Sequence, residues 1–151
     1  MATVDRNTLE NNGLLFVRDV LRENLTDPLG TRSASDWIVK SPVKNENISL
    51  PMVVLDQSSV KDERVTFKDA VKTTLSIGLM IWANKIQNRD ELNDAIKGIL
   101  SNDLNTDGTN TMYSQGLTYN GSDSRNSDGY VQGFSELLRI KEMTVNLLFL
   151  K

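Results

Sequence analysis

The sequence predicts a single α+β domain: a mostly antiparallel sheet of about four strands with two helices packed on one face, plus a long polar insertion. Three segments carry this prediction. In residues 65–83 apolar side chains recur at every second position, which is typical of a half-buried strand. In residues 8–25 and 88–100 they recur at steps of three and four, which is typical of a one-sided helix. A chain of 151 residues suffices for one such domain.

The segment 65–83 is the longest regular element that the sequence predicts. At about 3.3 Å per residue an unbroken strand would be roughly 60 Å long, whereas ordinary strands have about 3 to 10 residues. We therefore expect a bend or interruption near residues 68–70, with residues 75–83 beneath the helices. The Val65 end should project as a hairpin arm with residues 52–56 and reach an adjacent subunit.

A helix is the alternative for this segment. Five side chains also fall at helical spacing: Val71, Leu75, Leu79, Trp82 and Ile86. Adjacent threonines, two isoleucines and the mid-run Gly78 favour the strand, because β-branched residues suit strands and glycine weakens a helix interior.

The remaining elements follow in chain order. Thr8 is a plausible N-cap of the first helix, and Asn88 is one for the second. Residues 37–39 and 52–55 read as short strands, and residues 57–64 as a polar loop before the long strand. Short connections join antiparallel neighbours, so we expect these strands to be antiparallel. Residues 136–151 alternate again and predict a closing strand.

Residues 101–133 differ in composition from the rest of the domain, which we assign to residues 1–151. Asn, Asp, Ser, Thr and Gly dominate this stretch, and its bulky apolar residues are scattered. Such a segment buries too little surface to offset its ordering entropy. We predict a flexible insertion, or an arm ordered by a neighbour, in which Tyr113, Leu117 and Tyr119 could form a short hairpin.

Composition excludes several function classes. The chain has neither cysteine nor histidine, which removes disulfides, thiol nucleophiles, thiolate or imidazole metal sites and the commonest general base. A net charge of −3 argues against a general binder of phosphate backbones. The start of the chain has no basic-then-apolar leader, and no apolar run reaches ~18 residues, so we expect a soluble protein without membrane contact. No catalytic constellation and no cofactor site are expected.

One pattern resembles half of a calcium-binding loop. Asp103, Asn105 and Asp107 place oxygen ligands at alternating positions before a glycine. The second half of the pattern fails, because Asn110 and Ser114 stand where an aliphatic residue and a bidentate glutamate are needed. A turn is therefore favoured over weak calcium binding.

The order of elements resembles the tail terminator, or tail-completion, proteins of long-tailed bacterial and archaeal viruses. The resemblance lies in three features. These are an N-terminal helix ending in Asp27-Pro28, a proline-led valine strand with a polar exit over residues 56–59, and a very long alternating strand leading into a capped helix. It covers most of the chain except residues 101–133.

This resemblance implies a homo-oligomeric ring, a hexamer, on the head-proximal end of the virion tail, assembled in the host cytoplasm. Such a ring ends polymerisation of the tail tube protein and presents a surface to the head–tail connector, or neck, protein. Double-stranded DNA would pass through it without sequence-specific contacts. The alternatives are another neck or tail-tube protein, and a non-viral calcium- or partner-binding module.

Candidate residues for the subunit interface lie on the predicted arm: Met52, Val54, Val65, Phe67, Lys68 and Lys72. Long strands with free edges are natural means of joining identical subunits. The long strand has a modest basic flank, which comprises Arg64, Lys68, Lys72, Lys85 and Arg89. We interpret it as a solvated face, with contact to passing DNA as the alternative.

Overall fold

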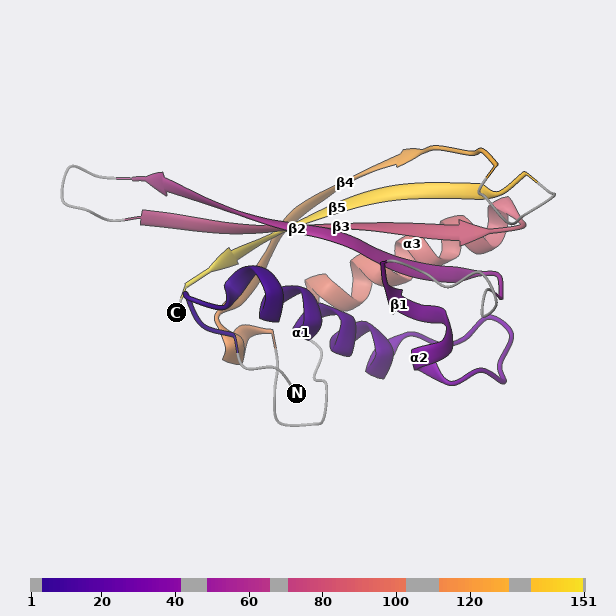
Figure 1. Ribbon diagram of the computed structural model, residues 1–151, viewed down its shortest axis with the longest axis horizontal. Coiled ribbons are helices and arrows are strands. Elements are labelled where there is room, and N and C mark those ends of the chain that lie inside the picture. Colours follow the sequence, from indigo (N-terminus) through magenta and orange to yellow (C-terminus); the bar gives the residue numbers. More distant parts are fainter. Residues whose placement is uncertain (1–3, 42–48, 66–70, 103–111, 131–136, 151) are drawn as a thin grey trace.

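The computed structural model describes residues 4–41, 49–65, 71–102, 112–130 and 137–150. It confirms the predicted α+β domain: a five-stranded sheet carries its two main helices on one face (Figure 1). In chain order the elements are α1 (Leu9–Asn24), α2 (Ala34–Trp37), β1 (Ile38–Lys40), β2 (Met52–Arg64), β3 (Val71–Ala83), α3 (Ile86–Ser101), the 3-10 helix η2 (Tyr113–Gln115), β4 (Leu117–Asn126) and β5 (Arg139–Phe149). The strands lie side by side in the order β1-β2-β3-β5-β4.

The hydrophobic core lies between the sheet and the two main helices. Side chains at alternate positions of β3 point into it, among them Leu75, Ile77, Leu79 and Ile81, each at most 1% exposed. This confirms the expectation that residues 75–83 pack beneath the helices. At Gly13, α1 lies close against β3, since a Cβ at this position would lie 2.5 Å from Leu75 Cδ2. Among the described helices, none is both long and apolar enough to cross a membrane.

The long strand is shorter than predicted, and its neighbour is longer. β3 begins at Val71, not at Val65, and residues 57–64 belong to β2 rather than to a loop. The two strands pair antiparallel from Met52↔Trp82 to Arg64↔Val71, with a register shift between Leu55 and Gln57. Polar side chains suit this part of β2 because its own side chains are exposed or partly exposed, so pairing with β3 decides the conformation instead of burial of β2 itself. The bend expected at 68–70 falls outside the described residues.

Two further predictions about the strands are wrong. β1 pairs with β2 in parallel, from Ile38↔Val53 to Lys40↔Leu55, because residues 41–51 are long enough to return the chain to the same end of the sheet. The insertion 101–133 contributes a strand, β4, which pairs antiparallel with β5. Its side chains alternate too weakly to reveal a strand, since Leu117 is its only fully buried member.

Helix ends also differ from the sequence prediction. α3 begins at Ile86 after Lys85, so Asn88 lies inside the helix and is not its cap. Thr8 stands at the N-cap of α1 but makes no capping bond with its side chain. Instead Asp5 Oδ1 accepts hydrogen bonds from the backbone amides of Asn7 and Thr8, at 2.9 and 3.0 Å.

The loop after α1 is closed by a half-buried ion pair. Arg32 Nη2 lies 2.7 Å from Asp27 Oδ1, and the two side chains are only 10% and 9% exposed. Arg32 also donates to the Ser49 carbonyl and lies 5.2 Å over the Trp37 ring. Hydrogen bonds from Arg32 lower the pKa of Asp27 to about 2, against the opposing effect of its burial.

Candidate assembly surface

The feature that distinguishes this domain is a hairpin arm, which we define as residues 57–64 of β2 and 71–76 of β3. Figure 1 shows it projecting past the helices at the side away from α3. The arm extends beyond both neighbouring strands, because β1 pairs only with Val53–Leu55 and the pairing of β5 with β3 ends at Thr73↔Phe149. Its end is therefore a two-stranded ribbon, which is marginally stable by itself in water.

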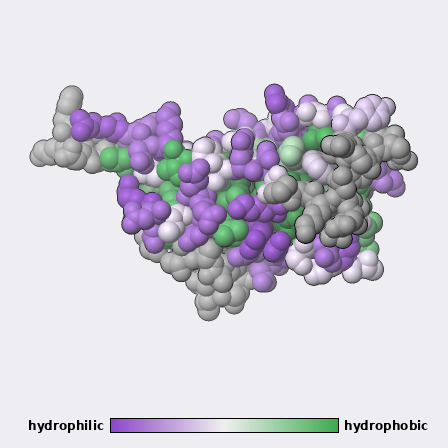
Figure 2. All heavy atoms as spheres, in the orientation of Figure 1, coloured by the Kyte–Doolittle hydropathy of each residue, from purple (hydrophilic) through white to green (hydrophobic). Residues whose placement is uncertain are grey.

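Exposed valines mark this ribbon. Val60, Val65 beside the arm, and Val71 are 37%, 61% and 46% exposed. Lys72, one of the predicted interface residues, is exposed as well. In Figure 2 hydrophobic side chains appear on this side of the molecule only in small areas between hydrophilic ones. The valines are scattered singly and form no contiguous apolar patch, so the projection of the ribbon, rather than its apolarity, distinguishes this surface.

The base of the arm is fixed to the body. Ser58 Oγ donates to the Glu10 carbonyl of α1 at 2.8 Å. Thr73 Oγ1 donates to Asp62 Oδ1 at 2.6 Å and accepts from Arg6 Nη1 at 3.4 Å. Farther out, Lys61 Nζ lies 2.9 Å from Glu63 Oε1. Their hydrogen bond raises the pKa of Lys61 and lowers the pKa of Glu63, but both groups are solvent-exposed. The arm is thus held in a defined direction.

The structure separates the predicted interface residues into two groups. Val65 and Lys72 lie at the arm, whereas Met52 and Val54 are each 1% exposed and lie at the opposite end of β2, paired with Trp82 and Met80. The expected pairing of the Val65 end with residues 52–56 is therefore wrong, because the hairpin register brings residues 57–64 there. Phe67 and Lys68 lie outside the described residues, as do the calcium candidates Asp103, Asn105 and Asp107.

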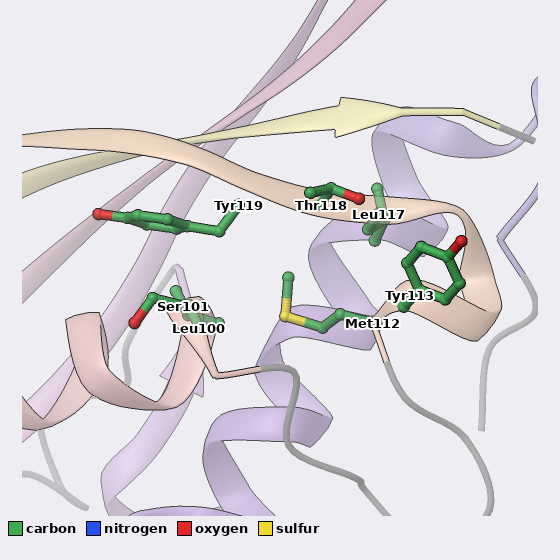
Figure 3. A pocket seen from close by; sticks show the side chains of 7 residues that line it. All are labelled: Leu100, Ser101, Met112, Tyr113, Leu117, Thr118 and Tyr119. Carbon is green, nitrogen blue, oxygen red and sulfur yellow. The ribbon is translucent and has the colours of Figure 1, made fainter.

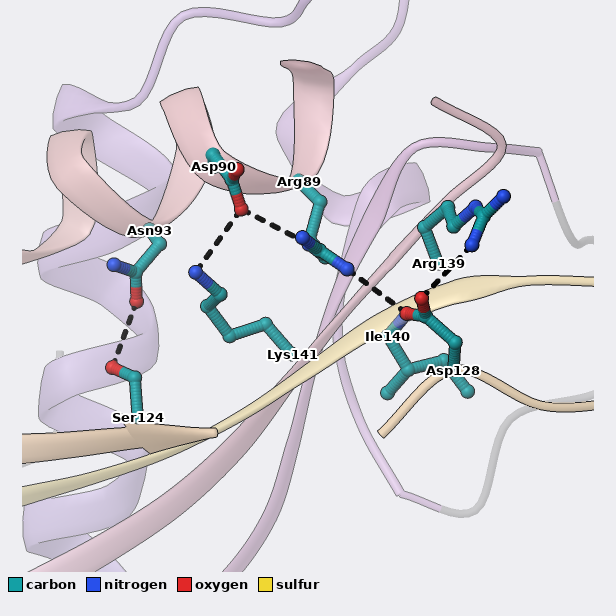
Figure 4. A network of polar contacts seen from close by, with 8 residues as sticks. All are labelled: Arg89, Asp90, Asn93, Ser124, Asp128, Arg139, Ile140 and Lys141. Carbon is teal, nitrogen blue, oxygen red and sulfur yellow. Dashed lines mark hydrogen bonds and ion pairs between the residues drawn. The ribbon is translucent and has the colours of Figure 1, made fainter. Parts of the chain in front are cut away.

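Arg89 also departs from its predicted place on a solvated basic face. It is 5% exposed and belongs to a polar network that joins α3 to β5 and to the segment after β4 (Figure 4). Its Nε lies 3.0 Å from Asp90 Oδ1 and its Nη1 lies 2.9 Å from Asp128 Oδ1. Lys141 Nζ lies 3.0 Å from the same Asp90 oxygen, and Arg139 Nη1 lies 3.0 Å from Asp128 Oδ2.

Electrostatics within the network hold both carboxylates ionised. Hydrogen bonds from Arg89, then from Lys141, lower the pKa of Asp90. For Asp128 desolvation is the largest influence and raises the pKa, but hydrogen bonds from Arg139 and the Ile140 amide outweigh it and leave a lowered pKa. Every charge in the network has an opposite partner, so we assign it a structural role rather than proton transfer.

A shallow cavity of about 160 Å³ lies between the end of α3 and β4 (Figure 3). Its lining is mostly apolar, with Met112 projecting between Leu100 and Leu117. The polar groups beside it are hydroxyls, and the Tyr119 hydroxyl is 2.9 Å from Ser122 Oγ. Within the described part of the chain, no carboxylate lines this cavity, and no group of three or more His, Cys, Asp or Glu side chains is arranged for a metal ion.

Comparison with known proteins gives a structural match alone. No family model matches the chain, and no curated protein sequence does. A chain in the solved structure of the virion of a native gene transfer agent particle has a similar fold, with a TM-score of 0.50 and 16% sequence identity. The match covers 88% of this chain and 91% of that chain. At this identity the likeness establishes the shared fold.

Proposed function

We propose that this chain is a structural protein of a phage-like particle and acts as its tail terminator. The observation that carries the proposal is the hairpin arm, which exposes valines on a two-stranded ribbon beyond the rest of the sheet. The end of the arm adds little to the stability of a monomer, because the described side chains beyond Thr73 are exposed. A subunit that must hold an identical neighbour gains a contact from it.

A further observation supports a role in assembly. The fold is similar, over 88% of the chain, to a chain of a gene transfer agent virion.

In this role about six copies form a ring on the head-proximal end of the tail tube. The ring contacts the tail tube protein on one side and the neck protein on the other, and DNA passes through its centre. A neck or tail-tube protein of the same particle is the alternative, since all three kinds of ring subunit would need an arm of this type.

Adding the purified chain to tail tubes assembled in vitro tests the proposed position. A terminator should appear as a ring at one end of each tube in electron micrographs, and tubes should stop growing. Growth from capped ends would contradict the terminator role, and incorporation along the whole tube would favour the tail-tube alternative.

Reversing charge on the arm tests its part in assembly. Lys72→Glu should weaken ring formation far more than folding. The reason is that Lys72 is exposed and contributes nothing to the core. Intact rings with unchanged thermal stability would count against the arm as the contact.

A further inference from the structure

The sheet has two free edges, and they face in opposite directions. On one side, β2 is paired by β1 only at Val53–Leu55, so from residue 57 outward no other described strand adjoins that edge. On the other side, β4 is the last strand of the sheet. A free edge presents unpaired backbone amides and carbonyls, which form hydrogen bonds readily with another strand.

The directions of these edge strands suit each other. β2 runs antiparallel to β3, β3 to β5, and β5 to β4, so β2 and β4 run in opposite directions within one sheet. A second copy can be placed beside the first so that both sets of helices stay on the same face. Its β4 then meets the free edge of β2 antiparallel, which is the more stable pairing.

We propose that β4 of a second copy of this chain pairs with residues 58–62 of β2, so that the sheets of neighbouring subunits join edge to edge. This inference rests on the proposed ring function and names the surfaces that meet within the ring. The contact is heterologous, since each copy contributes its β4 edge to one neighbour and its β2 edge to the other. Repeated with a constant rotation, it closes into a ring.

Charges on the two edges select a register. Lys61 lies opposite Thr74, and Asp123 lies opposite Thr144. Both threonines alternate with buried neighbours, so Lys61 and Asp123 are on the face away from the helices. Both side chains are exposed. An antiparallel register that sets Lys61 against Asp123 joins opposite charges on one face.

Neighbouring registers are less favourable. With Lys61 opposite Asp123, Arg125 faces Ser59 and Asp62 faces Ser122, so no like charges meet. A slip of two residues in one direction sets Lys61 against Arg125 and Glu63 against Asp123, which places like charges opposite each other. A slip of two in the other direction sets Lys61 against Gly121, so the opposite-charge pair is lost. A slip of one residue puts the side chains on the wrong faces.

A bulge limits the contact to the second half of β4. The register of β4 with β5 shifts between Tyr119 and Ser122, where Gly121 has a φ of 112°. Bulges interrupt edge pairing, so residues 122–126 provide the continuous part. In the favoured register these residues lie opposite residues 58–62 of β2, which is the part of β2 left free by β1.

Engineered disulfides test the register directly, because the natural chain has no cysteine. We expect Lys61→Cys with Asp123→Cys to give, on oxidation, a ladder of covalent oligomers up to the ring number. Residues directly opposite bring their Cα atoms to about 4.5–5.5 Å, within disulfide range. The matched control is Lys61→Cys with Arg125→Cys, on the same strands and face, which should give little ladder because its pair is diagonal, with Cα atoms about 7–8 Å apart.

Charge exchange gives a second readout that needs no cross-link. Lys61→Asp or Asp123→Lys alone should weaken each subunit contact up to about fivefold, and the two together should restore it. The edge pairing would be overturned if rings form normally, the Lys61→Cys/Asp123→Cys pair gives no ladder and the charge exchange gives no rescue. That outcome would leave the proposed function standing. A wild-type chain that stays monomeric would overturn both.

Discussion

The two ends of the β2-β3 hairpin have the same backbone pairing and opposite surroundings. At one end Val53↔Ile81 and Leu55↔Leu79 lie under the helices and are at most 1% exposed. At the other end Glu63↔Lys72 and Arg64↔Val71 stand on the arm, where the side chains are exposed. One pair of strands therefore serves two purposes. The covered end stabilises the fold, and the arm is available to a neighbour.

The largest difference should come from truncating an apolar residue at each end. Leu79→Ala should cost about 2–5 kcal/mol of unfolding free energy, because it leaves a cavity in the core. Val71→Ala should cost less than about 1 kcal/mol, since Val71 is 46% exposed, yet it should weaken assembly. Urea unfolding and light scattering on both variants measure the two effects. Similar losses of stability would contradict the division between the ends.

The next effect concerns the network that fastens α3 to β5. Arg89→Met should cost about 2–3 kcal/mol, because Asp128 loses a buried partner while Arg139 still neutralises part of its charge. Arg125→Met is the matched control on the sheet surface, where the Arg125 side chain is 78% exposed in its pair with Glu142, and it should cost less than about 1 kcal/mol. Equal thermal midpoints for the two variants would contradict the structural role assigned to Arg89.

Acid should weaken the body of the domain through Asp27. Its pKa is lowered from 3.8 to about 2 in the folded chain, so the unfolded chain binds the proton more readily. The resulting stabilisation is present above about pH 4 and is lost as pH falls toward 2, and it amounts to about 2 kcal/mol. Asp27→Asn should lower stability at pH 7 and flatten this part of the pH profile. A profile as steep as that of the wild type would show that other carboxylates are responsible.

The smallest effect compares two helical glycines. Gly13→Ala should destabilise by about 1 kcal/mol, because the gain in helix propensity is outweighed by the clash with the fully buried Leu75. Gly98→Ala should instead stabilise by about 0.5–1 kcal/mol, since a Cβ there meets no atom within 4 Å. Thermal unfolding of the two variants should therefore shift in opposite directions.

Periodicity in the sequence predicted the covered parts of the molecule. The α+β class, both main helices and the inward face of β3 follow from apolar side chains at fixed spacing, because burial on one side leaves that pattern. The closing strand was found for the same reason, although β5 is shorter than predicted.

The exposed strands left no such pattern. Residues 57–64 and β4 are mostly polar on both faces, so their conformation depends on pairing with β3 and β5 and leaves no periodic pattern within the strand itself. The same cause misplaced the candidate site. An arm was expected from the length of one alternating segment, but Met52 and Val54 were assigned to it because the partner strand was not recognised beyond residue 56.

If this chain assembles through its arm into a closed ring, the purified protein should have the mass of that ring in solution. Light scattering coupled to size exclusion should give a single multiple of the 16.9 kDa chain mass that does not change with concentration. The value expected is that of about six copies. A mass of one chain at high protein concentration, in a sample that unfolds cooperatively and is therefore folded, would contradict the account.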